Sequence, residues 1–189
     1  MANTFLTPKM IISGSDALES AKSELSRLGK KAFIVTDATM VKLGNVLLLE
    51  KILKEIKTDY YIFSEVNYEP DDLIVIKGKD TYKENNCDFL IALGGGSPID
   101  TAKAISVLLK NDAPLSSYMG KIIDIARPAL VAIPTTAGPG SEATKVTIIN
   151  DTTTKVKMLL TGPCLIPDLA IIDPAFSKSA PKSVTSHTG

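Results

Sequence analysis

The sequence predicts an α/β fold in which a Rossmann-like parallel sheet is flanked by helices, with a small β-hairpin near the C-terminal end. Short runs that are apolar at every position, such as 89–93 and 129–133, alternate along the chain with amphipathic helical runs. Strands that are apolar throughout are typical of parallel sheets covered on both faces. The 189 residues, 44% of them hydrophobic, suffice for one such core, so we expect a single domain over 1–189.

The strands come from short β-rich runs that separate the helical segments. The run "KAFIVTD" at 31–37 is of the buried-strand type and ends in Asp37. Similar runs place the other strands at 9–12, 59–66, 88–93, 129–134 and 167–174. Ligands of such sheets bind beyond the carboxyl ends of the strands, near the point where the strand order reverses.

The runs between these strands have helical periodicity, with apolar residues recurring at intervals of three and four. They predict helices over 15–29, 39–56, 70–86 and 98–110. Gly29 favours a stop at the end of the first helix, and Gly44 is a weak point within the second. Two further runs, "TKVTIIND" and "KVKMLLTG", flank "DTTT" and predict the hairpin.

The charge and cysteine content exclude several classes of function. Lys and Arg number 21, as do Asp and Glu, so no field of one sign favours nucleic acid or an anionic membrane surface. The longest apolar runs are too short to span a bilayer, and the N-terminus shows no secretory signal. Cys87 and Cys164 lack a C-x-x-C spacing. A disulfide framework and a zinc knuckle are therefore not expected, and a reducing cytoplasm fits.

The run "GGGSPID" at 94–100 joins a strand to a helix. Ser97 is predicted as the N-cap, with Pro98 at the first helical position and Asp100 completing an S-x-x-D capping box. A helix start presents free N–H groups and the positive end of the helix dipole, which favour an anion. The glycines let a phosphate approach the backbone, although a tight turn without a ligand also uses glycine. Asp100 is either this cap alone or a ligand contact.

An acidic residue, Asp37, ends the strand at 31–37. Its carboxylate can accept both hydroxyls of a ribose and would repel a 2′-phosphate, and it can equally cap the helix that follows. The usual G-x-G-x-x-G fingerprint and the Walker pattern are both absent. The order also differs from the usual motif, because here the acid precedes the glycines.

A second loop, "IPTTAGPGSEAT" at 133–144, follows another buried strand. Thr135 and Thr136 supply hydroxyls, and the glycines allow a ligand to come close. The alternative is a flexible loop stiffened by its prolines. Lys157 can reach a ribose or phosphate as a point charge, although most lysines are simply solvated.

These pieces together resemble the iron-containing, metal-dependent alcohol dehydrogenase family. The resemblance runs over essentially the whole chain. It rests on "IVTD", "GGGSPIDTAKAI", "IPTTAGPGSE", the "KVK" before the last strand, "IPDLAIIDP" and the tail "SAPKSVTSHTG". The glycine and threonine motifs are specific in this order and separation, and the "PTTAGPGSE" loop favours this branch over the related glycerol dehydrogenase and dehydroquinate synthase group.

The resemblance implies that residues 1–189 form an NAD(H)-binding domain of an enzyme that moves a hydride between NAD(H) and a small alcohol or aldehyde. By the family pattern, the glycine loop holds the pyrophosphate, and Asp37 contacts the adenosine ribose and favours NAD over NADP. The threonine pair and the lysine line the cofactor cleft. The residues expected at the cofactor are Asp37, Gly94, Gly95, Gly96, Ser97, Asp100, Thr135, Thr136 and Lys157.

Two departures from the family pattern qualify these expectations. The family often has "N-P" after the third strand, whereas this sequence has "YEP", which places Glu69 at the asparagine position. Family members also continue into a helical domain that binds Fe²⁺, or sometimes zinc, through one aspartate and three histidines. This sequence ends at Gly189, and its one histidine, His187, does not match a ligand.

We therefore expect no metal site and no catalytic residue in this chain, which would be the truncated cofactor-binding half of such an enzyme and inactive alone. The alternatives are a non-catalytic dinucleotide-binding module and a glycerol dehydrogenase-like oxidoreductase domain. Loss of the partner domain should bare an apolar face, so we expect a homo-oligomer.

Overall fold

The computed structural model describes residues 4–111, 113–178 and 186. A six-stranded sheet forms its centre, in the order β1-β8-β5-β4-β2-β3, and every neighbouring pair of strands is parallel. The strands are β1 (Met10–Ser13), β2 (Lys31–Val35), β3 (Asp59–Phe63), β4 (Phe89–Gly94), β5 (Leu130–Pro134) and β8 (Leu169–Ile172). The predicted parallel sheet is confirmed.

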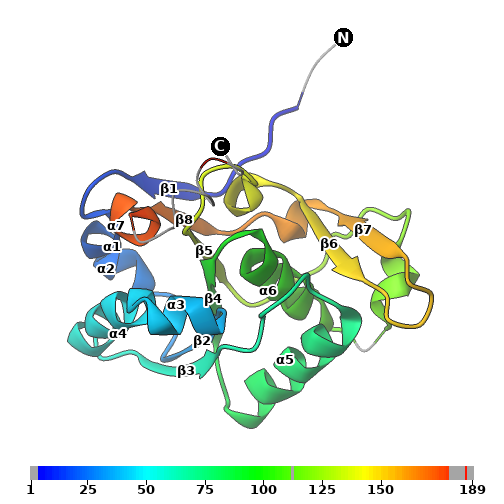
Figure 1. The fold of residues 1–189 in the computed structure, drawn as a ribbon, viewed down its shortest axis with the longest axis horizontal. Helices are drawn as coiled ribbons and strands as arrows, with labels where there is room; N and C mark the ends of the chain where they lie inside the picture. The colour runs from blue at the N-terminus through cyan, green and yellow to red at the C-terminus, as the bar shows by residue number, and fades with distance from the viewer. Residues whose placement is uncertain (1–3, 112, 179–185, 187–189) are drawn as a thin grey trace.

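Helices cover both faces of this sheet (Figure 1). One layer contains α5 (Asp72–Glu84) and α6 (Gly96–Leu108). The other contains α1 (Ala17–Ser20), α2 (Lys22–Leu25), α3 (Ala38–Lys42), α4 (Asn45–Glu55) and α7 (Pro174–Ser177). Along β4, Leu90 and Ala92 belong to the core beneath α5 and α6, and Ile91 and Leu93 belong to the core on the opposite face. This alternation explains why the strand is apolar at every position.

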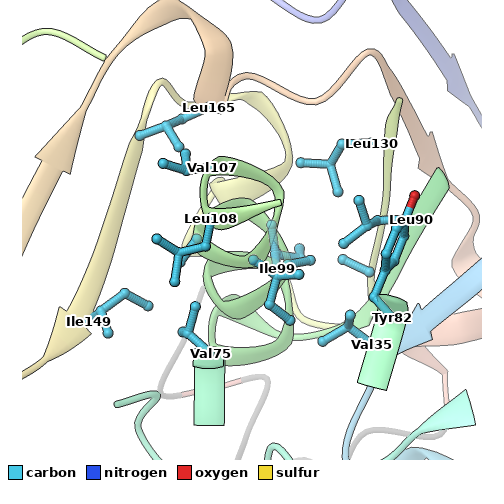
Figure 2. Close-up of a cluster of buried hydrophobic side chains, with 14 of the residues drawn as sticks. Val35, Val75, Tyr82, Leu90, Ile99, Val107, Leu108, Leu130, Ile149 and Leu165 are labelled. Carbon is cyan, nitrogen blue, oxygen red and sulfur yellow. The ribbon is translucent and has the colours of Figure 1, made fainter. Parts of the chain in front are cut away.

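The helix α6 lies inside the molecule, between the sheet and the hairpin. The hairpin consists of β6 (Val146–Asn150) and β7 (Lys157–Thr161), which pair antiparallel as predicted. Figure 2 shows apolar side chains of the sheet, of α5 and of the hairpin gathered around α6. Ile99 and Val107 of α6 are almost completely buried there, as is Ile149 of β6. Because α6 is covered on all sides, its sequence is apolar far beyond one amphipathic stripe.

Two of the predicted helices are interrupted. The segment 15–29 forms α1 and α2, because the N–H of Ala21 shares its hydrogen bonds between the carbonyls of Ala17 and Leu18 and the turn tightens there. The segment 39–56 forms α3 and α4, separated at Gly44, whose φ of 80° no helix allows. The expectation for 70–86 is confirmed by α5, which begins after an Asp71 cap on the N–H of Ile74.

Both cysteines are free thiols, Cys87 buried and Cys164 partly buried. None of the helices within 4–111, 113–178 and 186 has the length and hydrophobicity needed to traverse a lipid bilayer. Part of the family-like tail, including His187, lies outside the described residues.

Candidate functional site

The carboxyl ends of four neighbouring strands meet around one cavity of about 380 Å³. The strand order reverses between β2 and β4, because β2 leads outward to β3 while β4 leads the other way to β5 and β8. Crevices at such reversals are the usual ligand sites of open α/β sheets. The cavity is lined by Asp37, Thr39, Met40, Val66, Asn67, Tyr68, Gly95, Gly96, Ser97, Pro98, Thr135 and Thr136.

The three glycines after β4 have two different functions. At Gly94, φ is +153°, and a Cβ there would lie 2.6 Å from Cγ of Pro98, so this position needs glycine for the backbone itself. At Gly95, a Cβ would meet only Thr136, at 3.4 Å from its Oγ1. A Cβ on Gly96 would have its nearest neighbour 3.5 Å away, on Pro139. Gly95 and Gly96 therefore leave open a space that a ligand can occupy.

The start of α6 differs from the predicted capping box. The helix begins at Gly96 with Gly95 as its N-cap, and no side chain caps it. Ser97 and Pro98 therefore lie inside the first turn, because the flexible glycines allow the helix to begin earlier than the sequence signals predicted. Gly95, Gly96 and Ser97, at this uncapped helix start, line the cavity. The free N–H groups of a helix start, together with the helix dipole, favour an anion there.

Asp100 neither caps α6 nor lines the cavity. Its Oδ2 accepts a hydrogen bond of 3.1 Å from the N–H of Ile148 in β6. Its Oδ1 is buried and has no hydrogen-bond partner among the described residues. Burial is the main cause that raises the pKa of this carboxyl above its ordinary value, although Lys103 opposes the shift. The structure thus turns Asp100 toward the hairpin.

Asp37 lies on the cavity wall and also caps a helix. Its Oδ1 accepts from the N–H groups of Thr39, at 2.8 Å, and of Met40, at 3.0 Å, so it is the N-cap of α3. The capping role is therefore confirmed. It does not compete with a ligand role, since both bonds use one carboxylate oxygen. The N–H of Ala38, which directly follows Asp37, donates instead to the side-chain oxygen of Asn67 at 3.2 Å. The sequence did not predict this role for Asn67.

The threonine loop, defined here as residues 135–144, follows β5. It therefore lies on one side of the glycines that follow β4, and Asp37, which follows β2, lies on the other. The N–H of Thr135 donates to the carbonyl of Gly94 at 3.0 Å, which continues the β4–β5 pairing into the loop. Thr135 is buried, and Thr136 beside it carries the hydroxyl nearest Gly95. The structure therefore brings together the glycines and the threonine pair that the sequence singled out.

Lys157 does not line the cavity. Its ammonium forms an ion pair of 2.8 Å with Glu69, and Asn150 donates to the same carboxylate at 3.3 Å. Both charged side chains are largely exposed. Lys157 and Asn150 hold the pKa of Glu69 below its ordinary value. Lys157, which the sequence predicted at the cofactor cleft, is thus paired with Glu69.

Two further features escaped the sequence reasoning. Val66, Asn67 and Tyr68 line the cavity after β3, although the rule that ligands bind beyond strand ends could have indicated them. Lys103 in α6 is completely buried, and its ammonium bonds to the end of the threonine loop. The signal for it is a single lysine within 98–109, where most residues are apolar.

Within 4–111, 113–178 and 186, no three His, Cys, Asp or Glu side chains are placed to hold a metal ion. His187 lies outside these residues. The cavity lined by the start of α6, the threonine pair and Asp37 has the space and the donors for a phosphate-containing ligand.

Comparison with known proteins identifies the family to which this chain is related. The family model described as iron-containing alcohol dehydrogenase matches residues 8–174. The chain is 38% identical over 192 aligned residues to an NAD-dependent methanol dehydrogenase of Bacillus methanolicus, a match that covers 100% of this chain and 50% of that protein. It is 37% identical to a choline dehydrogenase of Bacillus subtilis, with 99% of this chain and 48% of that protein covered.

Solved structures agree with these matches. A 1,3-propanediol oxidoreductase superimposes with a TM-score of 0.95 at 31% identity, over 100% of this chain and 50% of that one. A sulfoacetaldehyde reductase of Bifidobacterium kashiwanohense in complex with NAD⁺ superimposes with a TM-score of 0.87 at 27% identity, again over 100% and 50%. The chain thus spans about half the length of the curated relatives it matches. It belongs to the iron-containing alcohol dehydrogenase family.

Proposed function

We propose that this chain is the NAD(H)-binding half of a metal-dependent alcohol dehydrogenase. The observation that carries the proposal is the cavity in which the uncapped start of α6, the threonine pair and Asp37 meet. A dinucleotide needs an anion seat for its pyrophosphate and an acceptor for its ribose hydroxyls, and this cavity offers both.

Several residues of the cavity take part in holding the cofactor. The N–H groups of the first turn of α6 bind the pyrophosphate, and Gly95 and Gly96 leave room for it. Asp37 accepts from the adenosine ribose and repels the 2′-phosphate of NADP, so NAD is preferred. The hydroxyl of Thr136, which faces Gly95, donates to the phosphate or ribose from the other side.

In the whole enzyme, the nicotinamide ring of the bound cofactor donates or accepts the hydride. The relatives named above include dehydrogenases of small alcohols, which supports a small alcohol or aldehyde as the substrate class. The iron or zinc of the family would polarise the substrate oxygen as a Lewis acid. Because the described residues supply no set of metal ligands, we propose that catalysis requires the half of the protein that the relatives have in addition.

The cofactor proposal is tested by calorimetric titration of the purified chain with NADH and NADPH. The parent chain should bind NADH more tightly than NADPH. The Gly95→Asp variant, which places a charge and a side chain in the phosphate seat, should lose NADH binding. Ser23→Asp adds the same charge on exposed α2, remote from the cavity, and should bind as the parent does. Equal NADH binding by all three chains would contradict the proposed site.

The catalytic part of the proposal has its own test. The chain is mixed with the C-terminal half of a relative and Fe²⁺, and alcohol-dependent NAD⁺ reduction is followed by absorbance. Turnover only in the complete mixture supports a divided enzyme. Turnover by this chain alone would show that the residues described here suffice, and no turnover in any mixture would favour a non-catalytic dinucleotide-binding module.

We also propose that the isolated chain self-associates. Ile148 and Leu159 face each other across the hairpin on its outer side, and they are 44% and 57% exposed. Neighbouring apolar side chains that remain exposed favour association with another surface. Light scattering at increasing concentration should show a dimer or larger species, and a constant monomer mass would contradict this.

A further inference from the structure

Lys103 is a charged side chain in the centre of the protein. It lies on the face of α6 that the hairpin covers and is 0% exposed. Its ammonium donates to the carbonyl of Thr144 at 2.9 Å, to the hydroxyl of Thr144 at 3.0 Å and to the carbonyl of Val146 at 2.8 Å. All three N–H donors of the ammonium are therefore used by a single short segment of chain.

Burying a charged ammonium costs free energy of desolvation, so its retention here needs a compensating function. Burial lowers the pKa of Lys103 to about 8, although the nearby carboxylates of Asp100 and Glu142 oppose the shift and Arg127 adds to it. A buried polar group is tolerated when it is fully hydrogen-bonded, and the three acceptors meet that condition. An apolar side chain would fill the same space without this cost, but it would leave two carbonyls without their donor.

A second pair of hydrogen bonds between α6 and this segment involves Asp100, one helical turn before Lys103. The backbone carbonyl of Asp100 accepts from the hydroxyl of Thr147 at 2.9 Å, and its carboxylate accepts from the N–H of Ile148 at 3.1 Å. Residues 100 and 103 lie on the same face of a helix. Together they bind the continuous segment 144–148 to α6.

The topology shows why segment 144–148 depends on these hydrogen bonds to α6. The threonine loop starts at the end of β5, which is fixed between two neighbours in the main sheet. It leads into β6, which pairs with β7 in a separate two-stranded sheet and contacts the segment before α5 through a bridge between Asn150 and Asp71. The end of the loop that leads into β6 is not paired as a strand of the main sheet, and the polar contacts from Lys103 and Asp100 fix it to α6. Because the glycine loop leads directly into α6, the same helix positions both loops of the cavity.

We propose that Lys103, assisted by Asp100, is a positioning residue that holds the threonine loop on α6, so that Thr136 stays opposite Gly95 in the geometry that binds the cofactor. The proposal rests on the NAD(H) site proposed above. It adds that the two loops form one rigid unit and that a buried ammonium outside the cavity sets the distance between them.

The first test compares Lys103→Met with Ile105→Ala in the full chain. Methionine fills the volume but donates no hydrogen bond. Ile105 is equally buried on α6 but faces Gly78 of α5 instead of the hairpin, so its truncation destabilises the core without touching the threonine loop. Amide hydrogen exchange should accelerate about tenfold or more across 136–148 in Lys103→Met, while β4 and β5 stay protected. Ile105→Ala should leave exchange in the loop close to that of the parent.

The second measurement is the NADH dissociation constant of the same variants. Lys103→Met should weaken binding about tenfold or more, whereas Ile105→Ala should stay within about twofold. In Lys103→Ala, n-propylammonium replaces the missing atoms, and its addition should restore affinity for NADH. The same amine should change nothing in Ile105→Ala. If Lys103→Met fails to fold, Thr144→Val removes one of the three acceptors and should shift loop exchange and affinity in the same direction by a smaller amount.

The outcomes separate the two proposals. Unchanged loop exchange together with unchanged affinity in Lys103→Met would overturn the positioning role, as would equal losses in Lys103→Met and Ile105→Ala with no rescue by the amine. Failure of the parent chain to bind NADH would overturn the cofactor site. In that case, accelerated loop exchange in Lys103→Met would still support the fastening of the loop to α6.

Discussion

Gly95 lies opposite Thr136, at a separation such that a Cβ added to the glycine would stand 3.4 Å from the threonine Oγ1. Positions 95 and 136 lie 41 residues apart in the sequence, and the hydrogen bond from the N–H of Thr135 to the carbonyl of Gly94 joins the two loops beside them. The gap between the loops exists because position 95 carries no side chain. The proposed phosphate seat thus depends on the absence of atoms at one position as much as on the donors around it.

The first prediction distinguishes Gly94, which the backbone conformation requires, from Gly95, which leaves space for the ligand. Gly94→Ala should lower the free energy of unfolding by about 1–3 kcal/mol, because its Cβ would clash with Pro98 and its φ of +153° is strained for alanine. Gly95→Ala should change it by less than about 0.5 kcal/mol. Urea denaturation measures both. Equal losses in the two variants would contradict this division.

The second prediction concerns the two functions of Asp37. Asp37→Asn keeps an oxygen that can accept from Thr39 and Met40, so stability should stay near that of the parent. Removal of the charge should weaken NADH binding and reduce the preference for NADH over NADPH. Asp37→Ala loses the cap as well and should cost about 1 kcal/mol of stability.

Thermal denaturation and titrations with both cofactors check this pair of variants. The asparagine variant is the informative one, because it changes the ligand contact while it keeps the cap. If Asp37→Asn bound NADH and NADPH in the same ratio as the parent, Asp37 would be a helix cap only.

The third prediction concerns the ion pair between Glu69 and Lys157. Glu69→Gln removes the carboxylate that holds the lysine, so Lys157 becomes available to an anionic cofactor and NADH affinity should rise about two- to fivefold. The melting temperature should barely move, since the pair is exposed. Glu65→Gln is the control. It removes the same charge from the same segment between β3 and α5, but its carboxylate pairs with Lys77 instead of Lys157.

A double variant distinguishes a local effect from a general one. If Lys157 acts on the cofactor, Lys157→Ala should abolish the gain that Glu69→Gln produces. A gain of the same size in Glu65→Gln, or one that persists without Lys157, would mean that net charge alone is responsible.

The fourth prediction is a pH dependence that arises from Lys103. Its pKa in the folded chain is about 8, below the ordinary 10.5, so between these values the unfolded chain holds more of this proton. This difference makes the free energy of unfolding rise with pH in that window, by at most about 1.4 kcal/mol per pH unit. The pKa of Cys87, raised to about 11 by burial, acts in the opposite direction above pH 9 in every variant.

The comparison with Lys103→Met isolates the contribution of the lysine, because Cys87 contributes equally to both proteins. The stability of the parent relative to the variant should increase between pH 7.5 and 9.5 in urea titrations. Parallel stability profiles would show that Lys103 does not carry a depressed pKa.

The ligand-facing ends of the strands can be predicted from the sequence because two signals coincide there. Buried strands are recognisable as apolar runs, and the residues just beyond them are unusual for a simple turn. Gly95, Gly96 and Thr136 are found in this way, and the structure brings them together at one cavity. The family resemblance agrees with this placement.

Other features depend on contacts that no local pattern reveals. The predicted Ser97 cap is wrong, because flexible glycines let α6 begin at Gly96. Asp100 has the right spacing for a cap but turns to the N–H of Ile148, which lies 48 positions away in the chain. Lys103 is marked in the sequence only as a single lysine among mostly apolar helix residues, which does not reveal its partner. Only the hairpin that packs over α6 makes it the buried donor to Thr144.

The central claim is that the cavity between the glycine and threonine loops binds NAD(H). The most direct measurement is an amide ¹H–¹⁵N chemical-shift map of the chain during titration with NADH. If NADH binds there, the largest shifts occur at Gly95, Gly96, Ser97 and Thr136, with smaller shifts around Asp37. Saturable shifts confined to another region, such as the 520 Å³ hollow beside Arg127 at the opposite end of the sheet, would contradict the claim.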